Sequence, residues 1–501
     1  MKSEDSHVTP EQTHNRRDAE TGSGKNLESS PFFLRKDLEP WQVAPAYAPH
    51  LKLGPPEERR KQGKALRKNS PIESHAHWKP NPNRPDPLEI VAASNVGRQE
   101  HLVPLRMGRM ASSPFAFLRG SATVMAWDLA HTAVSGPQVM VCGDAHLSNF
   151  GLFGTPERTI VFDLNDFDEV TLGSWEWDLQ RLVASVNVAG RENGLDRTAR
   201  KEAVVACVSG YREKARYLSA LPILEVWYLH HYPGQSNPVF EPDTKTQEVL
   251  QNAADKARKR DNAAFFNKVA HRSEDGAWRF NEEPPILKRL DEHTAEKVVQ
   301  SLIPYARTIS PHRGYMLQHY HTEDVAHRVV GVGSVGTRAY VLMLLGNDDS
   351  DAIFLQVKEA VAPAFAPYTP PPPPEFEHQG RRVVMGHRLL QATTDVLLGW
   401  TSIDGRHYFV RQMRDLKGSI EVEWLERSAF AMYARACGTL LARAHARSGD
   451  IAKISGYCGK SEALDEAMAD FAEAYGDQTE QDHEALVNAI RAGKIPAETG
   501  I

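Results

Sequence analysis

The segment "RVVGVGSVGTRAYVLMLLGNDDSDAIFLQVKEA", from Arg328 to Ala360, decides the fold that the sequence predicts. Branched and aromatic residues flank a glycine-rich turn and an Asn/Asp turn, which predicts three consecutive strands. The glycines match G-x-G-x-x-G, but a dinucleotide-binding fingerprint needs a helix that opens at the third glycine. Because "TRAYVLML" follows Gly336 and predicts a strand, we interpret the segment as an antiparallel hairpin with a third strand that carries Lys358.

Mainly helical patterns lie on both sides of this β-rich segment. After it, the five prolines of residues 370–374 predict a stiff linker, and "GRRVVMGHRLLQATTDVLLGW" predicts a helix. "TSIDGRHYFVRQMRD" then predicts a hairpin with Asp-Gly at its turn. We therefore predict an α+β fold with a small antiparallel β lobe and a large helical lobe. The predicted parts are a disordered N-terminus (1–30), an extended basic arm with short helical pieces (31–100), a helical lobe with catalytic and metal loops (101–325), the β-rich nucleotide-covering lobe (326–420) and C-terminal helices that complete the large lobe (421–501).

Composition excludes several classes of protein. The 501 residues carry a formal net charge of -6, so no broad basic field for nucleic acid is expected, and the basic arm is interpreted as a packing or solvated segment. The four scattered cysteines argue against a disulfide framework or a zinc ribbon. No apolar run is long enough to cross a membrane, and the polar N-terminus has no signal-peptide core. We expect a cytoplasmic protein without nucleic-acid or membrane partners, and nothing indicates its oligomeric state.

Two acidic loops, "GDAHLSNFG" and "FDLNDFDEV", precede the β-rich segment, and each follows an apolar strand. Asp144 and Asn149 have the spacing of a kinase catalytic Asp and its metal-binding Asn. Asp166 is then expected to bind Mg²⁺, which prefers oxygen ligands. Asp168 is a possible auxiliary ligand, and Asp163 is the competing choice. The alternative is that both loops are only turns, which Asp and Asn favour.

The glycine segment and Lys358 have the residue types that phosphate binding needs. Glycines allow the backbone to approach phosphates closely, and a lysine on a rigid strand supplies a positive charge. "LQVKEA" resembles the kinase "VAIK" strand, although a lysine on an edge strand is the alternative interpretation. The residues that we expect to bind nucleotide phosphates are Gly331, Gly333, Ser334, Gly336 and Lys358.

Together these motifs resemble aminoglycoside-phosphotransferase-type kinases. "GDAHLSNFG…VFDLNDFDEVTLGSWEWDLQRL" is similar to their signature "HGDLHPGN…IDFDDAGxGPxxxDL". Matching Asp178 to the last Asp of that signature makes Asp166, rather than Asp163, the metal-binding acid. The resemblance also implies that Asp144 is the catalytic Asp and that Asn149 binds metal. Asp178 would be a structural acid that holds the catalytic loop.

A closer resemblance covers about residues 50 to 480. This part resembles an uncharacterised bacterial domain family that is regarded as an outlier of the protein-kinase-like superfamily. The matching stretches are "GDAHLSNFG", "FDLNDFDE", "WEWDLQRL", "GVGSVGTR", "RLLQATTD", "YFVRQMRD" and "HARSGD". Kinases run from a glycine hairpin through a lysine strand to the catalytic loop, whereas here the catalytic loop comes first. The resemblance therefore implies a two-lobe kinase-like fold in circularly permuted order.

Two departures from the kinase pattern affect the expected site. Cys142 replaces the His that usually precedes the catalytic Gly-Asp, so His445 or Arg447 is expected to brace the loop. The helix after the prolines has no Glu to pair with Lys358, and Gln391 would substitute only by hydrogen bonding. A lost ion pair would weaken the positioning of the lysine.

Four further residues are candidates. The segment that contains Gln412 and Met413 corresponds to the kinase hinge, whose backbone meets the adenine. His146 is a possible auxiliary residue of the acidic loop. Arg119, in "FLRGSA", is a candidate phosphate or substrate contact, and an ion pair within the helical lobe is the alternative interpretation.

The resulting hypothesis is a kinase-like phosphotransferase that depends on ATP and Mg²⁺ and acts on an unknown acceptor, either a small molecule or a protein. The missing Lys–Glu pair motivates an alternative of the same fold, a nucleotide-binding pseudokinase or a nucleotidyl transferase. A second alternative is a metal-dependent phosphoesterase, because "GDAH" also fits a metal-bridging Asp with a nearby His.

Overall fold

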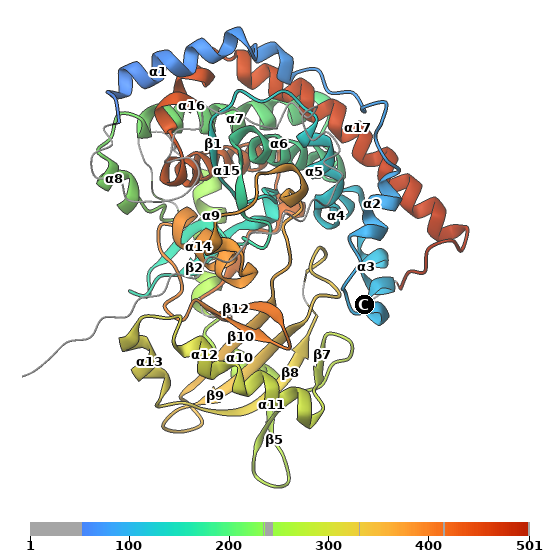
Figure 1. Ribbon diagram of the computed structural model, residues 1–501, viewed down its shortest axis with the longest axis vertical. Coiled ribbons are helices and arrows are strands. Elements are labelled where there is room, and N and C mark those ends of the chain that lie inside the picture. Colours follow the sequence, from blue (N-terminus) through green and yellow to red (C-terminus); the bar gives the residue numbers. More distant parts are fainter. Residues whose placement is uncertain (1–52, 234, 236–243, 330, 414–415, 499–501) are drawn as a thin grey trace, which may run out of the picture. The chain divides into compact units, whose positions relative to one another are not determined.

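A computed structural model describes residues 53–233, 235, 244–329, 331–413 and 416–498 (Figure 1). All of them belong to one unit that spans residues 39–501. Of the described residues about 51% are helical and 15% lie in strands, and they form several antiparallel sheets, which confirms the predicted α+β class.

The largest sheet has six antiparallel strands in the order β11-β12-β10-β9-β8-β7. The glycine segment connects β8 to β9, and Lys358 lies on β10 opposite Ala339 of β9, as the sequence predicts. The sheet begins before the predicted boundary at residue 326, because β7 and most of β8 are polar strands that precede it. The bounds are β7 (Leu287–Arg289), β8 (His321–Arg328), β9 (Ala339–Leu345), β10 (Ala352–Glu359), β11 (Gly399–Ile403) and β12 (Arg406–Gln412).

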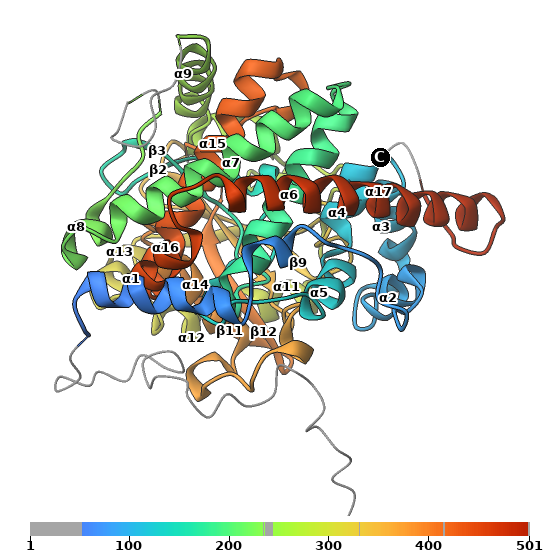
Figure 2. The same ribbon diagram turned by 90° about the horizontal axis from the view of Figure 1, so that it is seen from above.

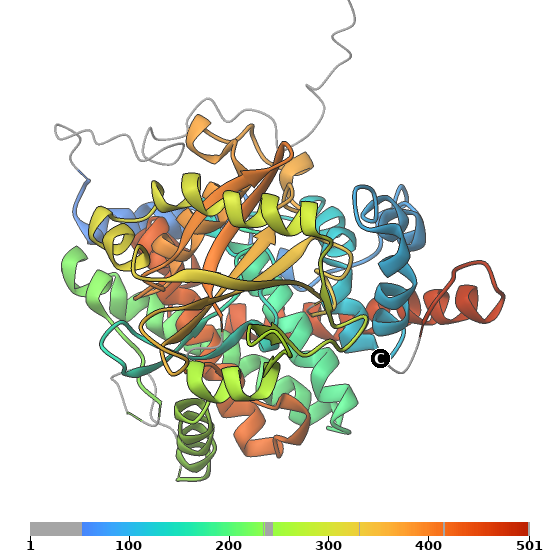
Figure 3. The same cartoon turned by 90° about the horizontal axis from the view of Figure 1, so that it is seen from below.

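Alternate residues of the central strands pack against helices on opposite faces of this sheet. Leu342 and Leu344 belong to the core under α11–α13, which cross one face (Figure 3). Met343 and Phe354 pack with Phe265 of α10 on the other face. The bounds are α10 (Asn262–Val269), α11 (Glu292–Gln300), α12 (Leu302–Ala306) and α13 (Pro311–Leu317), with a small hairpin β5 (Ala270–Arg272) and β6 (Trp278–Phe280) between α10 and α11.

The chain leaves β10 through the proline-rich connection and enters α14 (Gln379–Leu390), which packs on β11 and β12. Two short 3₁₀ helices, η6 (Ala366–Tyr368) and η7 (Pro374–Phe376), occupy the connection. The predicted hairpin follows, with positive φ angles of 48° at Asp404 and 75° at Gly405. Positive φ at both central residues is the requirement of a type I′ turn, which Asp-Gly satisfies.

Helices from before and after the large sheet form one helical part (Figure 2). Helix α15 packs along α7, and α17 contacts both α6 and α7. A Cβ at Gly438 of α15 would lie 2.0 Å from the carbonyl oxygen of Cys207 in α7, so only glycine allows this approach. The bounds are α3 (Val103–Met110), α4 (Pro114–Gly120), α5 (Ala122–Ala130), α6 (Trp175–Glu192), α7 (Arg197–Leu218), α8 (Ile223–Tyr228), α9 (Thr244–Arg258), α15 (Arg427–Ser448), α16 (Ile451–Cys458), α17 (Ala463–Arg491) and the 3₁₀ helix η8 (Val422–Trp424).

The part of the basic arm that the structure describes, residues 53–100, packs on the C-terminal helices. Helix α1 (Pro56–Ala65) lies against α16, where Arg59 pairs with Asp450 at 2.8 Å. Arg84 pairs with both Asp128 and Asp482. The sequence predicts an extended arm with short helical pieces, and the described part of the arm contains several short helices between non-helical segments. The C-terminal elements that pack against it lie far away in the sequence. The bounds are η2 (Leu66–Lys68), η3 (Ile72–His75), α2 (Pro87–Ala93) and η4 (Glu100–Leu102).

Two small sheets frame the acidic loops. Strand β1 (Gln138–Val141) pairs with β4 (Thr171–Ser174), and β2 (Phe150–Gly154) pairs with β3 (Ile160–Leu164) and β13 (Gly418–Ser419). Asp144 follows β1, Asn149 ends the 3₁₀ helix η5 (Leu147–Asn149), and Asp166 follows β3. All four cysteines are free and buried. Nowhere in the described ranges is a helix both long and apolar enough to span a bilayer.

Candidate active site

The first turn of α6 holds the loop that carries Asp144. The carboxylate of Asp178 accepts hydrogen bonds from the backbone N–H groups of Cys142 at 2.7 Å and Gly143 at 2.9 Å. Gly143 has a φ of +78°, and a Cβ there would lie 2.2 Å from the carbonyl oxygen of Glu169. The turn therefore requires glycine, and Asp178 makes the contact that its expected role as a loop-holding acid demands.

A chain of buried hydrogen bonds fixes Asp178 itself. His445 Nε2 lies 3.2 Å from Asp178 Oδ2, and the Tyr211 hydroxyl lies 2.8 Å from His445 Nδ1. His445 thus braces the loop from α15, whereas Arg447 donates to the backbone carbonyls of Leu389 and Trp227 instead.

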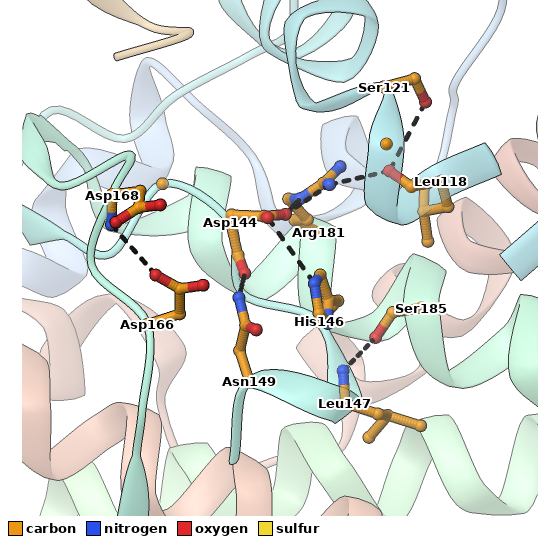
Figure 4. A network of polar contacts seen from close by, with 12 residues as sticks. Leu118, Ser121, Asp144, His146, Leu147, Asn149, Asp166, Asp168, Arg181 and Ser185 are labelled. Carbon is orange, nitrogen blue, oxygen red and sulfur yellow. Dashed lines mark hydrogen bonds and ion pairs between the residues drawn. The ribbon is translucent and has the colours of Figure 1, made fainter. Parts of the chain in front are cut away.

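Asp144 is held by an arginine that the sequence analysis did not single out (Figure 4). Arg181 approaches Asp144 Oδ1 with Nε at 2.6 Å and Nη2 at 2.5 Å, and it also donates to the carbonyl of Leu118 at 2.9 Å. The Asp144 side chain remains 20% exposed. Arg181 follows Asp178 by three positions, so both lie on one face of α6 and reach the same loop. That helical spacing is the signal that could have identified Arg181.

Asn149 and His146 complete this loop. The Asn149 side chain donates through Nδ2 to the backbone carbonyl of Asp144 at 2.7 Å, which leaves its amide oxygen as a ligand atom. His146 Nε2 lies 3.6 Å from Asp144 Oδ2. Burial, together with the charges of Arg119 and Arg181, lowers the pKa of His146 to about 4 even though Asp144 opposes the shift. The ring is therefore neutral near pH 7, and it cannot compensate the charge of Asp144.

The second acidic loop meets the lysine strand. Lys358, with its side chain 4% exposed, pairs with Asp168 Oδ2 across a sequence separation of 190 residues. Burial and the charge of Asp166 raise the pKa of Asp168, whereas the charges of Lys358 and Arg411 overcome burial and lower the pKa of Asp166 to about 2. Asp166 is thus the acid of this loop that keeps its charge most firmly. Gln391 does not contact Lys358, because it donates to the carbonyl of Leu164 at 2.6 Å.

Asp163 has a structural environment. It pairs with Arg443, whose side chain is 0% exposed, and it accepts a hydrogen bond from the backbone of Ala392 at 3.1 Å. Asp163 does not line the cavity described below, whereas Asp166 does. This difference in environment distinguishes Asp163 from Asp166.

Arg382 of α14 fastens the Asp168 loop to the β-rich part. Its guanidinium donates to the carbonyls of Asp168 at 2.8 Å, Val170 at 2.5 Å and Val361 at 2.7 Å. Helix α14 contains no Glu, and its Arg382 binds the backbone of the acidic loop. No local sequence signal indicated this contact.

A cavity of about 960 Å³ lies between the large sheet and the β2–β3 hairpin. Asn149, Asp166, Gln412 and Met413 line it, as do Arg411 and other basic residues. Asp144, Lys358 and the described residues of the glycine segment (331–336) do not line it. The predicted site residues therefore fall into a cavity group and a group beside the cavity.

The glycine segment packs against the helical part. Arg109 donates to the carbonyl of Gly331 at 2.7 Å, Arg98 donates to that of Val335 at 2.6 Å, and Gln99 donates through its backbone N–H to Gly336 at 2.8 Å. A Cβ at Gly333 would lie 3.2 Å from the carbonyl oxygen of Arg119. The guanidinium of Arg119 lies 5.8 Å from the centre of the Phe115 ring.

The oxygen atoms of these acids are of the kind that would fit a Mg²⁺ ion. Asp168 Oδ1 is buried and has no hydrogen-bond partner among the described residues. Asn149 and Asp166 add oxygen ligands of the kind that Mg²⁺ prefers. Within the described ranges no group of three or more His, Cys, Asp or Glu side chains could hold a metal by itself. Mg²⁺ commonly completes its shell with waters and substrate phosphates, so an incomplete protein shell suits it.

The fold and site define a mixed α+β protein in which acidic loops of the helical part meet a lysine strand beside a basic cavity. The chain belongs to the family described as "Uncharacterized protein conserved in bacteria (DUF2252)", whose model matches residues 98–489. No curated protein and no solved structure matches the chain. The family description carries no activity, so any function must be argued from the residues and their geometry.

Proposed function

We propose that this protein is a kinase-like phosphotransferase that uses ATP and Mg²⁺, acts in the cytoplasm, and has a two-lobe kinase-like fold in circularly permuted order. The order of elements in the β-rich part supports this proposal. A glycine-containing hairpin, a lysine strand, a helix and a second hairpin follow one another as they do in kinases. The catalytic-type loop and the acidic metal-type loop precede them in the sequence.

The pairing of Lys358 with Asp168 is the observation that carries the proposal. It joins the lysine strand to the acidic loop across 190 residues. The two pieces that the permuted order separates are therefore neighbours in space. In kinases a strand lysine and a metal-binding Asp must both be in place for phosphoryl transfer.

Each residue has a role that its contacts make feasible. Asp144 would accept or orient the proton of the acceptor hydroxyl, because Arg181 fixes its carboxylate and leaves it partly exposed. Asn149 and Asp166 would hold the metal ion, with Asp168 as a further ligand. When bound, the ion neutralises charge on the transferring phosphate. The acceptor is a small-molecule or protein hydroxyl that the site does not identify.

One observation favours the alternative within the same fold. Lys358 is engaged by Asp168 rather than by an acid of α14, so a pseudokinase or a nucleotidyl transferase is the second candidate. The phosphoesterase alternative is weaker, because a two-metal site needs several preorganised ligands and the described residues hold no such group.

The test combines binding with product analysis. The purified protein is incubated with ATP with and without Mg²⁺, its thermal midpoint is measured, and release of phosphate, AMP and pyrophosphate is followed. We expect Mg²⁺-dependent stabilisation by ATP and turnover that Asp144→Asn abolishes while stabilisation remains. Asp291→Asn, at the exposed N-cap of α11, is the matched control and should behave as the wild type.

Absence of ATP-dependent stabilisation in the wild type would refute nucleotide use altogether. AMP and pyrophosphate release would favour nucleotidyl transfer. Stabilisation without any turnover over a broad panel of acceptors would favour the pseudokinase.

A further inference from the structure

The cavity carries an excess of positive charge. Seven arginine and lysine residues line it, against three aspartates. Arg411 comes from β12, Arg313 from α13 and Arg260 from the connection between α9 and α10. Positive charges that are concentrated in a concave site attract anions and raise their local concentration. The chemistry of the wall therefore favours an anionic ligand.

Several of these cations form no direct ion pair with another described residue. Among the ion pairs between described residues, none includes Arg260, Lys268, Arg313 or Arg411. Arg411 is held in place by a hydrogen bond from Nε to Gln356 at 3.0 Å and by the ring of Phe409, 5.6 Å from its guanidinium. Arg411 lies close enough to Asp166 to lower the pKa of that acid, but it makes no direct ion pair among the described residues. A guanidinium that is fixed in this way is well suited to bind phosphate, which it can contact with two N–H groups.

The residues that the kinase pattern assigns to phosphates are engaged elsewhere. Arg98 and Arg109 donate to carbonyls of the glycine segment, which does not line the cavity over residues 331–336. The ammonium group of Lys358 pairs with Asp168. Phosphate groups inside the cavity would therefore contact the arginines and not the glycines.

We propose that the cavity binds a chain of phosphate groups along Arg411, Arg313 and Arg260. Asn149 and Asp166 line the same cavity, so the chain would begin at the candidate metal ligands and run along the basic wall. The phosphate groups belong either to the triphosphate of the nucleotide or to the acceptor substrate. Only the first of these two sources rests on the proposed function.

The test measures binding of three probes by titration calorimetry: adenosine, ATP and inorganic tripolyphosphate, each at low and high salt. The variants are Arg411→Gln and the double variant Arg260→Gln/Arg313→Gln. Arg109→Gln is the matched control, because this arginine contacts the glycine segment and not the cavity. Far-ultraviolet circular dichroism and thermal midpoints show that each variant is folded.

We expect tripolyphosphate to bind the wild type with an affinity that falls as salt rises. Arg411→Gln and the double variant should each weaken it about tenfold or more, as expected when charge-assisted hydrogen bonds are lost, and Arg109→Gln should leave it within about twofold. An equal loss of affinity for ATP identifies the nucleotide triphosphate as the source of the phosphate groups in the cavity. An unchanged ATP affinity beside a lost tripolyphosphate affinity identifies the acceptor.

Two results would overturn the inference: no binding of tripolyphosphate to the wild type, or binding that both cavity variants retain. Failure of the proposed function looks different. Tripolyphosphate bound through the arginines without any ATP turnover refutes the phosphotransferase and keeps the anion site. ATP turnover with a KM that the cavity variants do not change refutes the anion site and keeps the phosphotransferase.

Discussion

Asp163 and Asp166 lie on one short stretch, yet their contacts predict different consequences of substitution for stability and for nucleotide binding. Asp163→Ala leaves the fully buried guanidinium of Arg443 without its carboxylate, which is expected to cost about 3–5 kcal/mol of unfolding free energy. The backbone N–H of Ala392 also loses its acceptor. The charges of Lys358 and Arg411 lower the pKa of Asp166 to about 2, and its side chain is only partly buried, so Asp166→Ala is expected to destabilise the fold at neutral pH by less than Asp163→Ala.

Urea unfolding followed by circular dichroism measures both losses, with ΔΔG taken from the shift in midpoint at unchanged m. Arg443→Met alone and combined with Asp163→Ala completes a double-mutant cycle. We expect a coupling energy between the two positions of at least about 1 kcal/mol, because removing both charges eliminates the unpaired ion that either single variant leaves. Nucleotide binding should be retained by folded Asp163→Ala protein and lost by Asp166→Ala.

The reasoning fails if Asp163→Ala costs less than about 1 kcal/mol, or if the cycle shows no coupling with Arg443. It also fails, for the site rather than the core, if Asp163→Ala abolishes nucleotide binding while Asp166→Ala preserves it. In that case the acidic loop should be aligned with the kinase signature so that Asp163, rather than Asp166, matches the metal-binding acid.

Three further substitutions test the neighbourhood of the acidic loops. Burial raises the pKa of Glu169 to about 6, so the folded state favours the protonated form of this side chain. Glu169→Gln should therefore raise the thermal midpoint at pH 8, where the wild-type carboxylate is charged. The difference between the two proteins should vanish below about pH 4.5, where wild-type Glu169 is protonated in both the folded and the unfolded state. Gly143→Ala should be destabilising by more than about 2 kcal/mol in urea unfolding, since it combines a left-handed φ with a backbone clash; a neutral effect would contradict the described turn. Tyr211→Phe removes one hydrogen bond to His445 and should cost about 1 kcal/mol, with faster exchange of the amide protons of the Asp178-held loop as the structural readout.

The sequence predicted the elements whose signals are local. Strands β9 and β10 alternate between two buried faces, and the Asp404–Gly405 turn has the residues that its φ angles require, so period and turn chemistry were sufficient. The start of β8 was missed because "HTEDVAHR" is polar and becomes a strand by pairing with β9. Helix α1 lies in the arm for which the sequence predicted only short helical pieces, and its packing partner α16 could not be identified because it lies far away in the sequence.

The candidate site likewise combines residues that local sequence signals predict with partners that the sequence does not reveal. The spacing of Asp144, Asn149, Asp166 and Asp178 is a local signal, and all four lie around the two acidic loops in the structure. Their cationic partners could not be predicted, because a guanidinium reaches a carboxylate or carbonyl from any element that folding brings near. Lys358 illustrates this limit. The kinase pattern predicts that its acidic partner lies on the next helix, whereas in the structure the partner is Asp168, which precedes Lys358 by 190 residues.

The long separation between the acidic loops and the lysine strand is no obstacle to a shared site. The entropy of closing a loop grows only with the logarithm of its length, so a contact across 190 residues is little harder to close than one across half that distance. What the contact needs is local reinforcement, and Arg382 provides it by binding the carbonyls of Asp168 and Val170 beside the Lys358 pair. Several charged hydrogen bonds at one place thus maintain the connection between Lys358 and the acidic loop. In the proposed kinase-like arrangement, such contacts would keep these segments together in space although their order along the chain differs from that of kinases.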